Sequence, residues 1–158
     1  MSDHKPTSVP LWQQLQAVAQ ALVLVRRGVS GTAALDDVPP ALRPGVQALL
    51  FQVLRQLGRA TALREQLAAK APPPAADALL CTALALCWND ADAPYPIHTL
   101  VNQAVEAARQ QRQTRAQSGF INACLRRFLP FSSSSSTTCV KFSMMLASGS
   151  RVNTCFHR

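Results

Sequence analysis

The sequence predicts an all-α fold, a bundle of about six to seven helices, and three observations lead to this class. No segment alternates apolar and polar residues with the period of two that a half-buried strand requires. Alanine and leucine, which favour helices, are abundant in the first 130 residues. Between the prolines and glycines, apolar residues recur at helical spacing and would form one stripe on each helix.

The first predicted helix has Ser8 as its expected cap and Pro10 in its first turn. Its stripe has offsets of 0, 4, 7, 11 and 14 and consists of Leu11, Leu15, Val18, Leu22 and Val25. Gly28 is expected to close this helix. Residues 30–35 are expected to form a short helical turn before Pro39.

The next predicted helix begins at Pro44. Its stripe has offsets of 0, 3, 4, 7, 8 and 11 and consists of Val46, Leu49, Leu50, Val53, Leu54 and Leu57. Gly58 is expected to interrupt the helix, because glycine is a weak helix former. A separate helix carrying Leu63 and Leu67 would then run to the proline triplet at 72–74.

Residues 75–88 are apolar on nearly every side, which predicts a helix at the buried centre of the bundle. A loop is expected over residues 89–96. The helix that begins at about Ile97 would bury one face, made of Ile97, Leu100, Val101, Ala104, Val105 and Ala108.

The last predicted helix begins at Gly119. Its apolar stripe consists of Phe120, Ile121, Cys124, Leu125 and Phe128. Pro130 is expected to end this helix, so that Arg126 and Arg127 would lie in its last turn, near the negative end of the helix dipole.

Composition changes abruptly after Pro130 and predicts the domain limits. Residues 1–130 contain 24 alanines and 4 serines, whereas residues 131–158 contain 1 alanine, 8 serines and no acidic residue. We therefore expect a disordered N-terminus over residues 1–9, a helical domain over 10–130 and a low-complexity, disordered tail over 131–158. The tail is interpreted as an aberrant, out-of-frame end of a truncated gene, with a serine linker as the alternative.

The charge and cysteine patterns limit the function classes. Residues 1–130 carry 13 basic and 8 acidic side chains, and this net charge of +5 indicates a polyanionic partner, most often nucleic acid. No cysteine pair has zinc spacing, so no metal is expected, and Cys81, Cys87 and Cys124 fit reduced core positions. The polar N-terminus and the short apolar run at 75–88 predict a cytoplasmic protein without a membrane segment.

Two segments resemble the NusB/RsmB domain family. Residues 92–108, DAPYPIHTLVNQAVEAA, resemble its helix in which a proline is followed by V-N-E-A-V-E-A-A. Residues 119–128, GFINACLRRF, resemble its closing helix, G-F-V-N-A-V-L-R-R-F. The N-A-x-L-R-R-F form is closer to the N-terminal domain of the RsmB/Sun 16S rRNA cytosine-5 methyltransferases than to the antitermination factor NusB. The resemblance covers roughly residues 10–130 and implies a bacterial, NusB-like helical bundle that docks on rRNA.

Two departures limit what the resemblance implies. NusB-type factors meet RNA and a ribosomal protein through an arginine-rich stretch at the start of their first helix, but residues 9–14 contain no arginine. The methyltransferases continue into an S-adenosylmethionine domain with two cysteines, and the sequence around Cys139, Gly149 and Cys155 lacks the neighbours that this chemistry needs. We therefore expect a methyltransferase fragment that is not an enzyme and has no cofactor of its own.

Arginine clusters are the candidate RNA contacts, and each is expected at a helix end. They are Arg26, Arg27, Arg55, Arg59, Arg109, Arg112, Arg115, Arg126 and Arg127. RNA is the expected partner, with 16S rRNA implied by the resemblance. Two alternatives remain: a module of the antitermination type that binds a ribosomal or transcription protein, and an inert remnant of a truncated methyltransferase.

Overall fold

The computed structural model describes residues 9–87 and 95–133, and these residues contain helices and no strand. The elements are α1 (Leu11–Arg26), η1 (Ala33–Leu35), α2 (Arg43–Leu67), α3 (Pro74–Cys87), α4 (Ile97–Gln110), η2 (Arg115–Gln117) and α5 (Ser118–Ser133). The all-α class is confirmed. The described residues form five α-helices and two 3₁₀ turns, where the sequence predicted six to seven helices.

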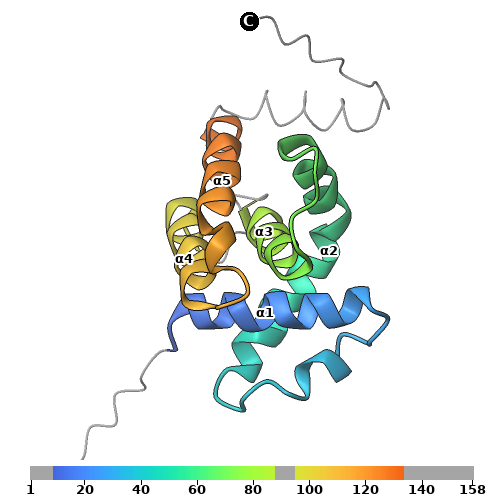
Figure 1. The fold of residues 1–158 in the computed structure, drawn as a ribbon. Coiled ribbons are helices and arrows are strands. Elements are labelled where there is room, and N and C mark those ends of the chain that lie inside the picture. Colours follow the sequence, from blue (N-terminus) through green and yellow to red (C-terminus); the bar gives the residue numbers. More distant parts are fainter. Residues whose placement is uncertain (1–8, 88–94, 134–158) are drawn as a thin grey trace, which may run out of the picture.

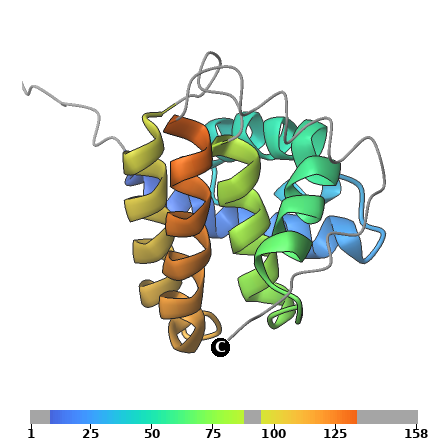
Figure 2. The ribbon, with the colours of Figure 1, turned by 90° about the horizontal axis from the view of Figure 1, so that it is seen from above.

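Helix α3 is the centre of the bundle, as its all-round apolar sequence predicts. Every residue from Ala76 to Cys87 is buried. Figure 1 shows α1 lying across the bundle, with α4 and α5 on one side of α3 and α2 on the other. Figure 2 confirms that α4 and α5 lie side by side. Helix α3 contacts α1, α2, α4 and α5, so its surface is covered on every side.

The predicted break at Gly58 is wrong, because α2 is one continuous helix from Arg43 to Leu67. Gly58 is exposed, whereas Val53, Ala60 and Leu63 are buried on both sides of it along the chain. The helical stripe therefore continues past the glycine. Burial of that stripe against α3 outweighs the weak helix propensity of one exposed residue.

The predicted end of the last helix at Pro130 is also wrong, since α5 continues to Ser133. Proline removes one intrahelical hydrogen bond and crowds the carbonyl four residues earlier, which weakens a helix without reversing the chain. Pro130 lies within the last turn of α5. Residues 134–158 lie outside the described part of the chain, as do Cys139 and Cys155.

The ends of α1 agree in part with the prediction. Pro10 is the N-cap residue and provides no side-chain cap, and Ser8 lies outside the described residues. At the other end, Gly28 has a φ of 97°, and its N–H donates to the carbonyl of Val25 at 2.9 Å. This left-handed conformation closes the helix as expected for glycine. Three further predictions concern residues outside the described part of the chain. They are the disorder of residues 1–8, the loop at 89–94 and the helical position of Trp88.

Side-chain hydrogen bonds join α1 to α4. The Gln16 amide donates to the carbonyl of Ala107 at 2.9 Å, and the Gln103 amide oxygen accepts from the backbone N–H of Trp12 at 3.2 Å. They complement the packing of Leu15 and Val18 against the core. The start of α1 is therefore held to α4, and the end of α1 is left to be held by other contacts.

The continuity of α2 predicts that Gly58→Ala stabilises the protein by about 0.5–1 kcal/mol. A Cβ at Gly58 would meet no atom within 4 Å, so the gain in helix propensity carries no steric cost. Urea unfolding followed by circular dichroism measures the change. The matched control is Gly28→Ala, which should destabilise by about 1–2 kcal/mol because its φ is 97°. Destabilisation by Gly58→Ala would indicate a break in α2.

Candidate nucleic-acid interface

A groove of about 550 Å³ lies where α1, the beginning of α3 and the connection between α4 and α5 meet. Its size is within the usual range for ligand sites in proteins. It is lined by Ala19, Gln20, Val23, Leu24, Arg27, Pro73, Pro74, Ala75, Gln111 and Gln113. None of these residues is acidic, so the lining carries a single charge, that of Arg27.

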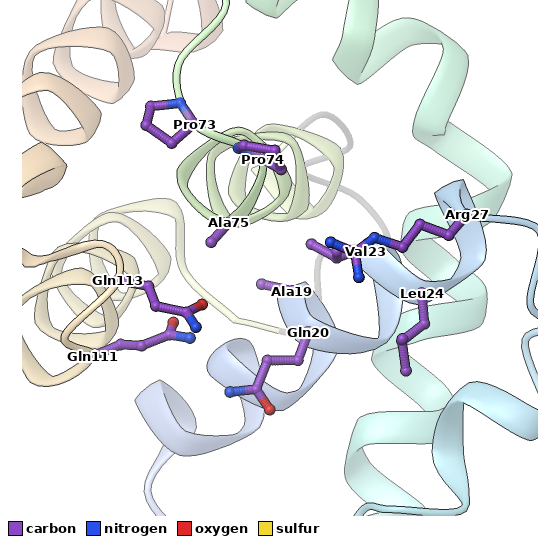
Figure 3. A pocket seen from close by; sticks show the side chains of 10 residues that line it. All are labelled: Ala19, Gln20, Val23, Leu24, Arg27, Pro73, Pro74, Ala75, Gln111 and Gln113. Carbon is purple, nitrogen blue, oxygen red and sulfur yellow. The ribbon is translucent and has the colours of Figure 1, made fainter.

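Figure 3 shows how the polar groups of the groove are arranged. The side chains of Gln111 and Gln113 point into the groove from the α4–α5 connection, and Arg27 reaches toward it from the opposite side. Pro73 and Pro74 form a further edge. The groove thus presents amide donors and acceptors on one side, a cation on the other and an apolar surface between them.

Arg26 and Arg27 are neighbours in the sequence but differ in their surroundings. Nη1 of Arg26 lies 2.6 Å from Oδ2 of Asp77, to which it donates a hydrogen bond. Nε of Arg64 lies 2.9 Å from Oδ1 of the same carboxylate. The Asp77 and Arg64 side chains are each only 12% exposed, so this cluster is a buried link among α1, α2 and α3. Arg26 is therefore held by a carboxylate, and Arg27 is left facing the groove.

The arginines near the α4–α5 connection also divide into two kinds. Nε of Arg115 donates to the carbonyl of Arg109 at 2.9 Å, which satisfies a carbonyl in the last turn of α4. Arg112 is exposed and lies between Gln111 and Gln113 in the sequence. Arg112 therefore adds positive charge to the segment that supplies the two amides.

The other predicted arginines do not line the groove, and two expectations about them are wrong. Arg55 and Arg59 are exposed in the middle of α2, not at a helix end, because α2 is continuous. Arg126 and Arg127 are exposed but do not lie in the last turn of α5, which contains no basic residue. Nε of Arg126 donates to Oδ1 of Asn122 at 3.0 Å, within its own helix.

Sequence reasoning missed the amide side of the groove. Gln20, Gln111 and Gln113 carry no individual signal, because glutamine is common on solvated helix faces. The proline triplet at 72–74 predicted only the end of a helix. The folded chain brings these segments together with Arg27, and no local pattern predicts that meeting.

The cysteines of the described helices lie in the core. Burial raises the pKa of the Cys81 thiol and the Asp77 carboxylate raises it further, against the opposing effect of Arg26 and Arg64. Burial also raises the pKa of Cys124, against the effect of Arg127. Partial burial acts to lower the pKa of Arg26, but its contacts with Cys81 and Asp77 outweigh burial and raise it. The predicted core positions are confirmed, since Cys81, Cys87 and Cys124 are all buried.

The described residues contain no group of three or more His, Cys, Asp or Glu side chains that could hold a metal ion. In this part of the chain, no helix has the length and apolar character needed to cross a membrane.

The sequence profile of the NusB family matches residues 13–130, which include every residue that lines the groove. The chain belongs to the NusB family. No curated protein and no solved structure was found to match it. Membership indicates an RNA-binding or antitermination-type helical module, whose partners are RNA or proteins. In this NusB-family domain, the groove lies at the junction of α1, α3 and the α4–α5 connection.

The buried carboxylate predicts a large effect of Asp77→Asn. Loss of its charge leaves Arg64 buried with only the exposed Glu65 carboxylate nearby, and we expect the free energy of unfolding to fall by about 3–5 kcal/mol. Urea unfolding measures the change. The control is Glu65→Gln, because Glu65 is exposed and its oxygen is 3.7 Å from Nη2 of Arg64. Glu65→Gln should change the free energy of unfolding by less than about 0.5 kcal/mol. Equal effects of Asp77→Asn and Glu65→Gln would contradict the role of Asp77 as the main counter-charge of Arg64.

The raised thiol pKa values predict low reactivity. Because the thiolate is the nucleophile, Cys81 and Cys124 should react slowly with iodoacetamide in the folded protein near neutral pH. Reaction should accelerate as the pH rises and in urea. Peptide mass spectrometry assigns the modification to each cysteine. Rapid labelling of Cys81 in the folded protein near neutral pH would contradict its burial and its raised pKa.

Proposed function

We propose that this NusB-family domain is an RNA-binding module and that the groove holds an unpaired segment of RNA. The observation that carries the proposal is the placement of Arg27 opposite Gln111 and Gln113 in a groove without acidic residues. A cation, amides and an apolar surface can contact the phosphate, the base edge and the base face of a nucleotide.

The chemistry of each group fits a part of a nucleotide. The guanidinium of Arg27 can hold a phosphate through two parallel hydrogen bonds. The amides of Gln111 and Gln113 can donate to and accept from the edge of a base. Bases are accessible for such contacts in loops and single strands, since the major groove of double-helical RNA is too narrow for side chains. An unpaired loop is therefore the proposed target.

The finer proposal is that the RNA is 16S rRNA and that the domain is related to the RsmB/Sun methyltransferases. The sequence from Asn122 to Phe128, N-A-C-L-R-R-F, supports this relationship within the family. In such a protein the helical module would dock the methyltransferase on rRNA in the cytoplasm. Its own contribution would be binding, with the methyl transfer from S-adenosylmethionine performed by a separate catalytic domain.

A second hollow favours the alternative, a protein partner of the antitermination type. Its volume is about 460 Å³, and it lies between the beginning of α1, the beginning of α2 and Tyr95. Apolar side chains contribute much of its lining, including Val9, Leu11 and Leu42. A ribosomal or transcription protein could bind there through an apolar side chain, and such binding would depend little on salt.

Binding of the full chain to a 16S rRNA hairpin loop and to a scrambled RNA, titrated across salt concentrations, tests the proposal. Tighter binding to rRNA with a steep salt dependence is expected. Arg27→Ala should weaken binding and reduce the slope of log K against log salt by about 0.7, the value for one phosphate contact on a single strand. Arg55→Ala is the matched control, because it removes the same charge from an exposed position in α2.

The outcomes separate the alternatives. Equal losses from Arg27→Ala and Arg55→Ala, with equal affinity for both RNAs, would indicate generic basic charge and contradict the groove assignment. Loss of rRNA preference in Arg126→Ala/Arg127→Ala would extend the contact surface to α5. Salt-insensitive association with a ribosomal protein, in the absence of RNA preference, would favour the protein-binding function.

A further inference from the structure

Arg26, Asp77 and Arg64 form an ion-pair cluster, and two of its members are close in sequence to residues that line the groove. Arg26 is the last residue of α1, and Arg64 lies in the last turn of α2. Asp77 lies in the first turn of α3. Its two oxygens contact one arginine each, at 2.6 Å and 2.9 Å. The cluster therefore joins three helices at the point where α1 ends and α3 begins.

The same two helix ends supply opposite parts of the groove. Arg27 follows Arg26 in the sequence, and Pro74 and Ala75 precede Asp77 by three and two residues. All three neighbours line the groove. The Arg26–Asp77 ion pair therefore holds the end of α1 close to the start of α3. It thus sets the distance across the groove between Arg27 and the edge that α3 forms.

Helix α1 supports Arg27 only through the backbone, where the Arg27 N–H donates to the carbonyl of Leu24 at 3.0 Å. Helix α1 ends at Arg26, Arg27 is the C-cap residue, and Gly28 turns the chain in a left-handed conformation. No further helical turn follows to hold Arg27 in place. The last anchored side chain before it is Arg26, whose guanidinium is fixed by the Asp77 carboxylate.

We propose that Arg26 and Asp77 are positioning residues for RNA binding, with Arg26 acting through Asp77 and not by contact with RNA. This inference rests on the proposed function of the groove. The charge of Arg26 is already balanced by a carboxylate bound at 2.6 Å, so Arg26 attracts a phosphate less strongly than Arg27 does. The pair instead holds the end of α1 against α3, so that Arg27 meets the phosphate while Gln111 and Gln113 meet the base.

The test compares Arg26→Gln, Arg26→Lys and Arg27→Gln in the full chain, with binding to the 16S rRNA hairpin measured across salt concentrations. Arg27→Gln should weaken binding and lower the salt slope by about 0.7, as loss of a phosphate contact requires. Arg26→Gln should weaken binding by about 3- to 30-fold, typical of a residue that acts without ligand contact, and leave the slope unchanged. Arg26→Lys should restore affinity, because its ammonium can still pair with Asp77.

Asp77→Glu is a second variant that keeps every charge and lengthens the link by one methylene. It should weaken binding with an unchanged salt slope, and it serves if Arg26→Gln does not fold by circular dichroism. A reduced slope in Arg26→Gln would mean direct phosphate contact and would overturn the inference. If Arg26→Gln or Asp77→Glu binds RNA with full affinity while Arg27→Gln binds weakly, the positioning inference is also overturned. The groove would then still be the RNA site. No effect of Arg27→Gln would instead overturn the proposed function.

Discussion

Complete burial of α3 is the constraint on which the rest of the structure depends. Every residue from Ala76 to Cys87 is buried, so α3 must be covered on all sides at once. Four helices contact it. Because a helix with apolar residues all round has no solvated face, α1, α2, α4 and α5 each turn one stripe toward it and keep polar residues outside. The one-sided apolar stripes of these four helices therefore complement the all-round apolar surface of α3.

Asp77 is the charged exception in α3, and it explains how the covering helices are placed. Moving a carboxylate and an arginine out of water costs several kcal/mol for each ion, and their attraction offsets this cost only with close contacts. Asp77 contacts Arg26 and Arg64 at 2.6 Å and 2.9 Å. Apolar packing allows small slides between helices, whereas these contacts favour one arrangement of α1 and α2 on α3. The shape of the neighbouring groove depends on this arrangement of the helices.

The sequence predicted the helices well where burial and local pattern agree. The stripe of Ile97, Leu100 and Ala104 and the left-handed turn at Gly28 are both found in the structure. The prediction failed where local propensity and tertiary packing disagree. Gly58 is a weak helix residue, yet it lies inside α2 between the buried residues Val53 and Ala60. Pro130 lies in the last turn of α5, where proline weakens the helix without ending it at once. The low helix propensity of one residue costs about 1–3 kcal/mol, which is less than the free energy gained by burying a continuous apolar stripe.

The sequence by itself determined the fold class, the central position of α3 and the basic character of the domain, because periodicity and composition are local properties of the chain. It could not distinguish Arg26 from Arg27. Only the tertiary structure decided that one pairs with Asp77, 51 positions away, and the other faces the groove. It also decided that Gln111 and Gln113 lie across from Arg27. The physical reason is that charge pairing and groove formation depend on contacts between distant segments, which no helical period encodes.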